Sequence, residues 1–448
     1  MKVDLLLKDV KAFLKGDILE CCIAIEGGKI LQIGKEPNMP LADEIISLKG
    51  LLVLPGLIDV HVHLRDEGKS YKEDFHSGTA AAAAGGVTTV LDMPNNNPIT
   101  MSAEALKRRM EKAKGKILVN VGFYSEFPEK LSEIDRIIRE GVIGFKLFMG
   151  TKMGGLNIDD DSAIRKALAR TASKVPIAVH AEDRKILEAA ERRLKLQGRS
   201  DIEAFILAHP EEAEVKAVKR IISLAKDIGC RLHLCHLSTS ESLKLVAEAK
   251  KVGKVVSCEV TPHHLFLSKD DLQHIGNFAV TVPPLRNKNH QEFLWKGLRT
   301  GIVDVIASDH APHTLEEKES NIIWYVKAGI AGLETMLPLL LTEVNKGRLS
   351  IGELVKLTAV NPAKIFNIPD AGSISEGGRA DLVAVNLKQE YRIDASKFKS
   401  KARFSPFDGW KVKGKPVKTF VAGKLIMDED EIVAKAGSGK IIRARFSS

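Results

Sequence analysis

Two histidines separated by one residue, His61 and His63, stand at the end of an apolar run at residues 58–64. On a β-strand, residues two apart face the same side, so both imidazoles could bind one cation. The pattern is short, and two incidental strand histidines would produce it equally well. A metal site is therefore expected only if further ligands reach the same place.

Four other apolar runs contain, or are directly followed by, a basic or acidic side chain. These residues are Lys146, His180, His236 and Asp309. Because an unpaired buried ammonium is costly, Lys146 must either extend to water or change its chemistry. A neutral lysine amine can react with carbon dioxide to form a carbamate, whose two oxygens could bridge two metal ions. Imidazoles and carboxylates bind zinc-like ions, and two such ions can share a hydroxide nucleophile. Together the residues predict a binuclear hydrolytic centre.

The elements that must position these residues alternate regularly between residues 52 and 361. Apolar runs of five to seven residues alternate with amphipathic helical stretches, and the runs are 58–64, 88–93, 117–123, 144–148, 176–180, 231–236, 255–260 and 303–308. Eight βα units of this length favour an α/β fold of the TIM (β/α)8 barrel type, in which reactive groups lie at the C-terminal ends of the strands. A doubly wound sheet would alternate similarly, but no G-x-G-x-x-G motif follows a strand.

Both ends of the chain have the pattern of short strands interrupted by glycine or proline. The expected strands are 3–7, 18–25, 29–34 and 44–48 at the N-terminal end, and 380–387 and 417–426 at the C-terminal end. Because chain termini often lie close together, the two ends could form one small β-sandwich domain. The predicted organisation is a barrel at residues 52–361, with residues 1–51 and 362–448 forming the β-sandwich.

Composition excludes several classes of protein. Of the 448 residues, 44% are hydrophobic and 28% charged, which is typical of a globular chain and excludes a largely disordered one. No apolar run approaches the roughly 20 residues of a membrane span, and Asp4 stands where a signal peptide would become apolar. We therefore expect a cytoplasmic protein with no membrane partner. The five cysteines form no C-x-x-C pair and are expected to be small buried residues.

The net charge of +9 is concentrated near the C-terminus. Residues 396–448 hold thirteen Lys or Arg against five Asp or Glu. Such a stretch could contact nucleic acid or form a solvated basic face. It contains no nucleic-acid-binding motif, so a solvated face without a nucleic-acid partner is predicted.

The residues of the expected metal centre resemble those of the amidohydrolase superfamily. The segment LPGLIDVHVH at residues 54–63 is similar to its strand-1 signature, and residues 372–383 are similar to the start of its C-terminal β domain. Within the superfamily, the chain resembles the dihydroorotases of the lysine-bridged type at three residues. These are Arg65 after the second histidine, Asn95 in the segment DMPN, and His313 in the segment DHAPH.

The resemblance implies two Zn2+ ions per subunit. The expected ligands are His61, His63 and Asp309 for the first ion, His180 and His236 for the second, and an N6-carboxylated Lys146 bridging both. Asp309 would also be the catalytic residue, taking the proton of the shared hydroxide and delivering it to the leaving ring nitrogen. Arg65, Asn95 and His313 would hold a free carboxylate of the substrate, since an arginine fork matches a carboxylate and the amide and imidazole add donors.

The implied activity is that of a dihydroorotase, the zinc-dependent reversible cyclisation of N-carbamoyl-L-aspartate to L-dihydroorotate in de novo pyrimidine (UMP) biosynthesis. The implied partners are this small-molecule substrate, a second copy of the chain in a homodimer, and aspartate transcarbamoylase.

Two alternatives stay open. A related cyclic amidase, an allantoinase or a dihydropyrimidinase (hydantoinase), would act on a ring without the carboxylate, and Arg65 and Asn95 argue against it. Val282 keeps this alternative open, because many dihydroorotases have asparagine there before the segment PPLR; Ala328, where phenylalanine is frequent, is a second departure. The other alternative is an inactive scaffold that binds a pathway partner through residues 396–448. The complete ligand set argues against it.

Other polar residues near these motifs are expected to have structural roles. His263 and His264 are expected to be structural or to support the site from behind its ligands, and His310 to point away from the metals. Glu182 and Asp183 are expected to begin a helix, where acidic residues suit the N-terminus.

Overall fold

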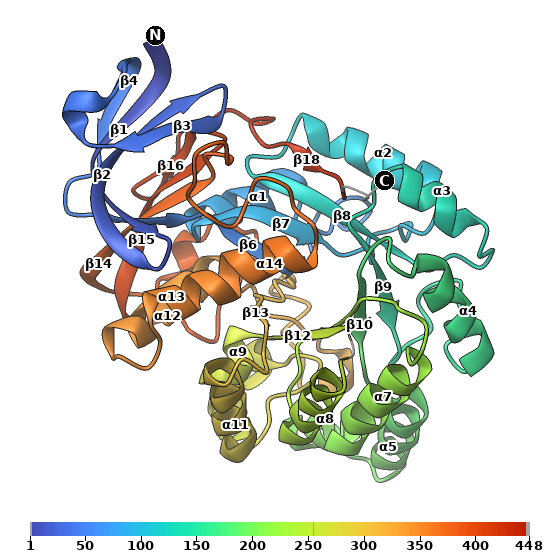
Figure 1. Cartoon of the computed structure of the whole chain (residues 1–448). Helices are drawn as coiled ribbons and strands as arrows, with labels where there is room; N and C mark the ends of the chain where they lie inside the picture. The colour runs from blue at the N-terminus through green and yellow to red at the C-terminus, as the bar shows by residue number, and fades with distance from the viewer. Residues whose placement is uncertain (1, 254, 445–448) are drawn as a thin grey trace.

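The computed structural model describes residues 2–253 and 255–444, and eight parallel strands form its centre (Figure 1). Neighbours in the sheet follow chain order: β6 (Leu57–Val62), β7 (Val87–Asp92), β8 (Asn120–Glu126), β9 (Gly144–Phe148), β10 (Ile177–His180), β11 (Leu232–Leu234), β12 (Val256–Val260) and β13 (Val305–Ile306). The segment after β13 returns to β6 through a parallel bridge between Val62 and His310. This arrangement confirms the predicted barrel.

The barrel strands are buried on both faces, which explains their continuous apolar sequence. Helices lie outside the strands (Figure 1). Their bounds are α1 (Phe75–Ala84), α2 (Ala103–Lys114), α3 (Glu133–Arg139), α4 (Asp161–Thr171), α5 (Arg184–Leu196), α6 (Ile202–Ala208), α7 (Glu211–Leu224), α8 (Ser240–Lys251), α9 (Pro262–Phe266), α10 (Lys269–Ile275), α11 (Lys288–Arg299), α12 (Leu333–Asn345), α13 (Ile351–Val355) and α14 (Asn361–Ile365). Typical of them is α2, which buries Leu106 and Met110 and begins at the N-cap Ser102.

A second sheet is built from both ends of the chain, as predicted. Its strands are β1 (Lys2–Leu14), β2 (Asp17–Glu26), β3 (Lys29–Gly34), β4 (Leu41–Ser47), β5 (Leu52–Pro55), β14 (Leu382–Arg392), β15 (Lys411–Val421), β16 (Lys424–Asp428) and β17 (Glu431–Ile432). Antiparallel pairing of β14 with β5 joins the two ends. Leu5, Val53, Leu382 and Phe420 share one core there.

The exact domain boundaries stay a prediction. Strand β5, at residues 52–55, lies in the second sheet, and β18 (Ile441–Ile442) pairs with β8 of the barrel. Each end of the chain thus contacts the barrel closely.

Two expected strands differ from the structure. The run 417–426 is a hairpin: Ala422 and Gly423, both with positive φ, form a two-residue turn between β15 and β16. Such turns match the twist of paired strands. Because Ala422 continues the apolar pattern, the sequence did not indicate the turn. The run 117–123 begins its strand at Asn120, because the carbonyl of Ile117 instead accepts the N–H groups of Gly437 and Gly439.

Within residues 2–253 and 255–444, no helix is long and apolar enough to cross a membrane. All five cysteines are free; four are buried and Cys21 is half-buried.

Candidate metal centre and active site

The C-terminal ends of the barrel strands bring the predicted metal ligands together. Nε2 of His61 and Nε2 of His63 both lie 3.3 Å from Oδ1 of Asp309. The Nζ of Lys146, fully buried in β9, lies 3.4 Å from Nε2 of His61. His61, His236 and Asp309 form a group that could hold a metal ion.

His180 joins this cluster through His236. Nδ1 of His180 and Nε2 of His236 are 3.0 Å apart, and the His236 ring centre is 5.2 Å from that of His61. Burial lowers the pKa of His61, His63 and His236, so their imidazoles are neutral and able to bind a metal.

Acceptors behind three of the histidines fix which nitrogen faces the centre. Glu259 accepts from Nδ1 of His61, and the Asn95 carbonyl oxygen lies 2.8 Å from Nδ1 of His63. Oε2 of Glu182 lies 2.9 Å from Nε2 of His180. Because each acceptor holds the ring proton, the other ring nitrogen carries no proton and faces the centre. Metal-binding histidines are usually oriented in this way.

These contacts test whether the residues fit a metal centre. Nδ1 of the buried His236 has no hydrogen-bond partner among the described residues. Lys146 donates to Sγ of Cys235 at 3.0 Å, and no carboxylate in residues 2–253 or 255–444 forms an ion pair with it. A buried amine without a counter-charge, beside inward-facing imidazole nitrogens, fits a site completed by metal ions.

Asp309 is held by unusual backbone geometry. Its φ is +45°, a left-handed conformation that non-glycine residues adopt at a cost, frequently at functional sites. On one side, the N–H of Ser308 donates to Asp59; on the other, the carbonyl of His310 accepts the N–H of His63 at 2.8 Å. Burial raises the pKa of Asp309.

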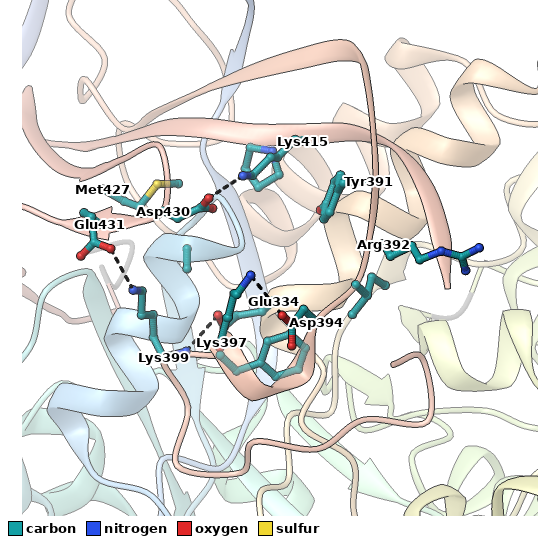
Figure 2. A pocket seen from close by; sticks show the side chains of 14 residues that line it. Glu334, Tyr391, Arg392, Asp394, Lys397, Lys399, Lys415, Met427, Asp430 and Glu431 are labelled. Carbon is teal, nitrogen blue, oxygen red and sulfur yellow. Dashed lines mark hydrogen bonds and ion pairs between the residues drawn. The ribbon is translucent and has the colours of Figure 1, made fainter. Parts of the chain in front are cut away.

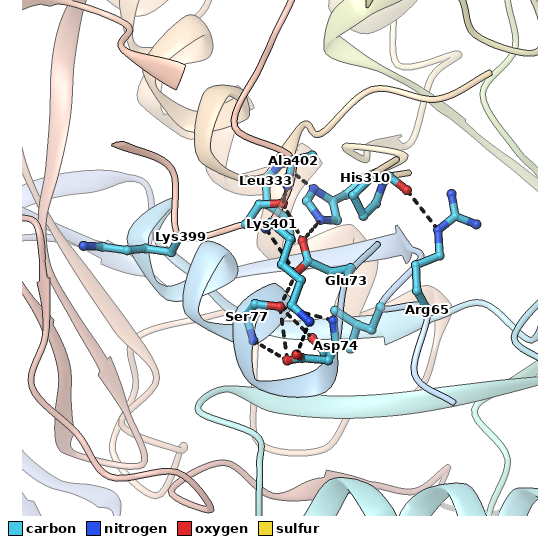
Figure 3. Close-up of polar contacts among 12 residues, drawn as sticks. Arg65, Glu73, Asp74, Ser77, His310, Leu333, Lys399, Lys401 and Ala402 are labelled. Atoms are coloured by element: carbon cyan, nitrogen blue, oxygen red, sulfur yellow. Dashed lines mark hydrogen bonds and ion pairs between the residues drawn. The ribbon is translucent and has the colours of Figure 1, made fainter. Parts of the chain in front are cut away.

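The His310 side chain points toward Glu73, with Nε2 3.4 Å from the carboxylate (Figure 3). The prediction that it points away from the metal ligands is confirmed.

Two of the three predicted substrate residues meet beside this centre. Arg65 is buried, its Nε donates to the carbonyl of Pro312 at 3.3 Å, and its Nη2 lies 3.3 Å from Nε2 of His313. The third residue, Asn95, contacts His63 through its oxygen, which leaves its NH2 group as a donor.

A family profile with the description "Amidohydrolase family" matches residues 52–426. The chain belongs to this family. A dihydroorotase of Methanothermobacter thermautotrophicus is 39% identical over 94% of each chain, and an L-hydantoinase of Paenarthrobacter aurescens is 33% identical over 99% of this chain and 98% of the relative. The solved L-hydantoinase from Arthrobacter aurescens has a TM-score of 0.94 at 32% identity, covering 98% of this chain and all of that one. The chain is therefore a hydrolase that acts on cyclic amides, as predicted.

Two carboxylates of this amidohydrolase were not expected at the metal centre. Glu259 is the one acid in the apolar run 255–260, a signal that could have identified it. Its buried carboxylate also accepts from Nε2 of His233 at 2.9 Å. Burial alone would raise the pKa of Glu259, but His61 and His233 outweigh it and lower the pKa.

The expectation for Glu182 is wrong. Asp183 caps α5 by accepting the N–H of Ile186 at 3.1 Å, as expected for an acidic helix start. Glu182 instead lies fully buried between His180 and His209.

His264 has a structural role, as expected: Nε2 lies 3.1 Å from the Pro283 carbonyl and Nδ1 lies 2.7 Å from the Thr261 hydroxyl. Nε2 of the buried His263 has no partner among the described residues.

Acidic partners offset much of the basic C-terminal stretch. A pocket of about 450 Å³ lies between α12 and the C-terminal strands (Figure 2). Lys397 pairs with Asp394 at 3.2 Å, and Lys415 with Asp430 at 2.6 Å. These lysines therefore do not form an unpaired cationic face at the pocket.

The same pocket contains a partly buried acid, Glu334, which accepts the backbone N–H groups of Lys399 and Ser400 at 3.0 and 3.1 Å. Burial raises the pKa of Glu334 to about 7.

Proposed function

We propose that this amidohydrolase is a dihydroorotase that interconverts N-carbamoyl-L-aspartate and L-dihydroorotate in pyrimidine synthesis. The observation that carries the proposal is the buried guanidinium of Arg65 beside His313, next to a cluster of potential metal ligands. A hydrolase for an uncharged ring would gain nothing from a buried cation there. A substrate carboxylate compensates such a cation and accepts bidentate hydrogen bonds from it.

The proposed centre uses all six predicted ligands with zinc, and Lys146 as its N6-carboxylated form. Two metal ions bound there would supply a hydroxide nucleophile and Lewis acidity toward the amide carbonyl. The buried environment of Lys146 supports carboxylation, because the carbamate replaces a buried ammonium that would have no ion-paired carboxylate and gives two oxygens that could bind metal ions.

The chain's own residues supply the remaining chemistry. Asp309 takes the proton of the attacking hydroxide and delivers it to the departing ring nitrogen. In the cyclising direction it removes the ureido proton and returns it to the carboxyl oxygen that departs as water. Arg65 binds the substrate carboxylate with its guanidinium fork, the Asn95 NH2 adds a donor, and His313 adds an imidazole N–H.

A hydantoinase or allantoinase activity is the second candidate. The high similarity to an L-hydantoinase favours it. Val282 favours it as well, because valine offers no side-chain hydrogen bond where many dihydroorotases have asparagine. Homodimerisation, association with aspartate transcarbamoylase and a cytoplasmic location stay predictions.

The test compares zinc-loaded protein on L-dihydroorotate, hydantoin, allantoin and dihydrouracil, following ring opening by absorbance. We expect selective turnover of L-dihydroorotate, and Arg65→Ala should abolish that selectivity. Preference for a ring without a carboxylate would support the second candidate. Zinc binding without turnover of any ring would contradict both candidates and leave an inactive scaffold.

A further inference from the structure

Lys72 is a second buried cation near the proposed carboxylate subsite. It lies between β6 and α1 and is 7% exposed. Its Nζ pairs with Oε1 of Glu317 at 2.7 Å and lies 3.2 Å from Nδ1 of His313. Oε2 of the same Glu317 lies 2.9 Å from Nδ1 of His313. Lys72 and Glu317 therefore compete for one nitrogen of a proposed substrate residue.

The other nitrogen of His313 has the same kind of competition. Its Nε2 lies 3.3 Å from Nη2 of Arg65, which can only donate, and 3.0 Å from the carbonyl of Ala328, which can only accept. Burial, with the charges of Arg65 and Lys72, lowers the pKa of His313 below its usual value. The ring is therefore neutral and carries a single N–H. At each nitrogen, either the neighbouring donor or the neighbouring acceptor is left without its hydrogen bond to the ring.

The two tautomers use these neighbours differently. With the proton on Nδ1, Glu317 accepts it and Nε2 accepts from Arg65, which occupies part of the guanidinium fork. With the proton on Nε2, Lys72 donates to Nδ1 and the Arg65 fork is released. Nε2–H then donates to the Ala328 carbonyl, and a substrate carboxylate bound by Arg65 can share or take over this hydrogen bond. Lys72 thus favours the tautomer that can bind an anionic substrate, and Glu317 favours the other.

We propose that Lys72 is a positioning residue for the carboxylate subsite, because it stabilises the Nε2–H tautomer of His313 and so favours ring substrates that carry a carboxylate. The proposal rests on the proposed function for its substrate class. Its chemical basis, the tautomer of His313, can be measured independently of turnover.

The experiment uses zinc-loaded full-length protein and three variants. Lys72→Met removes donor and charge, Lys72→Arg keeps both, and Glu317→Gln removes the competing carboxylate. Lys250→Met is the matched control, since Lys250 pairs with Asp304 at 2.7 Å and has no contact with His313 among the described residues. The measurements are KM and kcat on L-dihydroorotate and dihydrouracil, zinc content, and the ¹⁵N shifts of the His313 ring, assigned with His313→Gln.

We expect Lys72→Met to raise KM for L-dihydroorotate about tenfold or more, the scale of a charge-assisted hydrogen bond, with kcat, zinc content and dihydrouracil kinetics nearly unchanged. Its His313 should shift toward Nδ1–H. Lys72→Arg should restore the low KM, and Glu317→Gln should shift His313 toward Nε2–H without raising KM.

Equal increases in KM for both substrates, or in both Lys72→Met and Glu317→Gln, would overturn the proposal. An unchanged tautomer across the variants would do the same. If Lys72→Met fails to fold, Glu317→Gln still decides. The proposal requires this variant to shift His313 toward Nε2–H, and no shift or a shift toward Nδ1–H would contradict it. A wild-type enzyme that turns over dihydrouracil but not L-dihydroorotate would refute the proposed function, while the ring shifts would still test the role of Lys72.

Discussion

Glu259 allows a direct test of how the candidate metal centre is held, because one buried carboxylate serves three donors. It accepts from Nδ1–H of His61, from Nε2–H of His233 at 2.9 Å, and from the backbone N–H of His236 at 3.1 Å. In Glu259→Gln, the amide has one accepting oxygen, and its NH2 group must face one of these donors. The variant keeps the shape of the side chain but can no longer accept hydrogen bonds from all three donors.

The size of the effect follows from that mismatch. A buried donor left without an acceptor costs about 1–3 kcal/mol, which we expect as the loss of unfolding free energy in the metal-free protein. Loss of the acceptor that orients a metal-binding histidine weakens metal binding about 10- to 100-fold. Zinc affinity should fall by that factor because the imidazole of His61 is no longer held with Nε2 inward.

Competition with a chromophoric chelator measures zinc affinity, and denaturant titration of the metal-free protein measures stability. Glu343→Gln is the matched control: this carboxylate is also buried, but it pairs with Lys346 at 2.8 Å and contacts no histidine among the described residues. Wild-type zinc affinity in Glu259→Gln, or an equal loss in Glu343→Gln, would refute the argument that Glu259 orients the centre.

Three other variants test separate parts of the site and fold. Asp309→Asn should lower turnover by about 100- to 10,000-fold with an unchanged melting temperature, since it removes the proton carrier; near-normal rates would exclude that role. Lys146→Ala should lose one bound metal by elemental analysis, with partial rescue by a short carboxylic acid; two retained metals and a full rate would contradict the carbamate bridge. The raised pKa of Glu334 means the folded state binds its proton more tightly, so stability falls as pH rises from about 4 through about 7. Denaturant titrations between pH 5 and 8 should show about 2.5 kcal/mol more loss in wild type than in Glu334→Gln, and equal losses would disprove the assignment.

The barrel could be predicted from sequence because strands buried on both faces are continuous apolar runs, which few other elements produce at this regular spacing. The same rule predicted that His61, Lys146 and His236, far apart in sequence, would meet at one end of the barrel. Their placement follows from parallel strands sharing a direction, and it needs no knowledge of side-chain conformation.

Residues that act on other side chains were harder to predict. Glu259 lies 198 positions from His61, so their contact exists only after the barrel closes. Glu182 and Asp183 are chemically alike and adjacent, and backbone direction alone decides which caps the helix and which turns inward to His180. In the 417–426 run, hydrophobicity continues through Ala422, so the apolar pattern hides a turn that positive φ angles require.

The positions of the candidate residues explain why the fold alone does not decide the substrate. The potential metal ligands lie in the barrel strands or within three residues of their C-terminal ends, and a solved L-hydantoinase shares that fold with a TM-score of 0.94. Arg65, Asn95 and His313 lie in the loops that follow β6, β7 and β13, so substitutions among them change the contacts to a ring substituent without moving a strand. Zinc affinity therefore tests the metal ligands, and the ratio of L-dihydroorotate to dihydrouracil turnover tests these three side chains. Because the two sets would contact different groups, either half of the proposal can fail while the other stands.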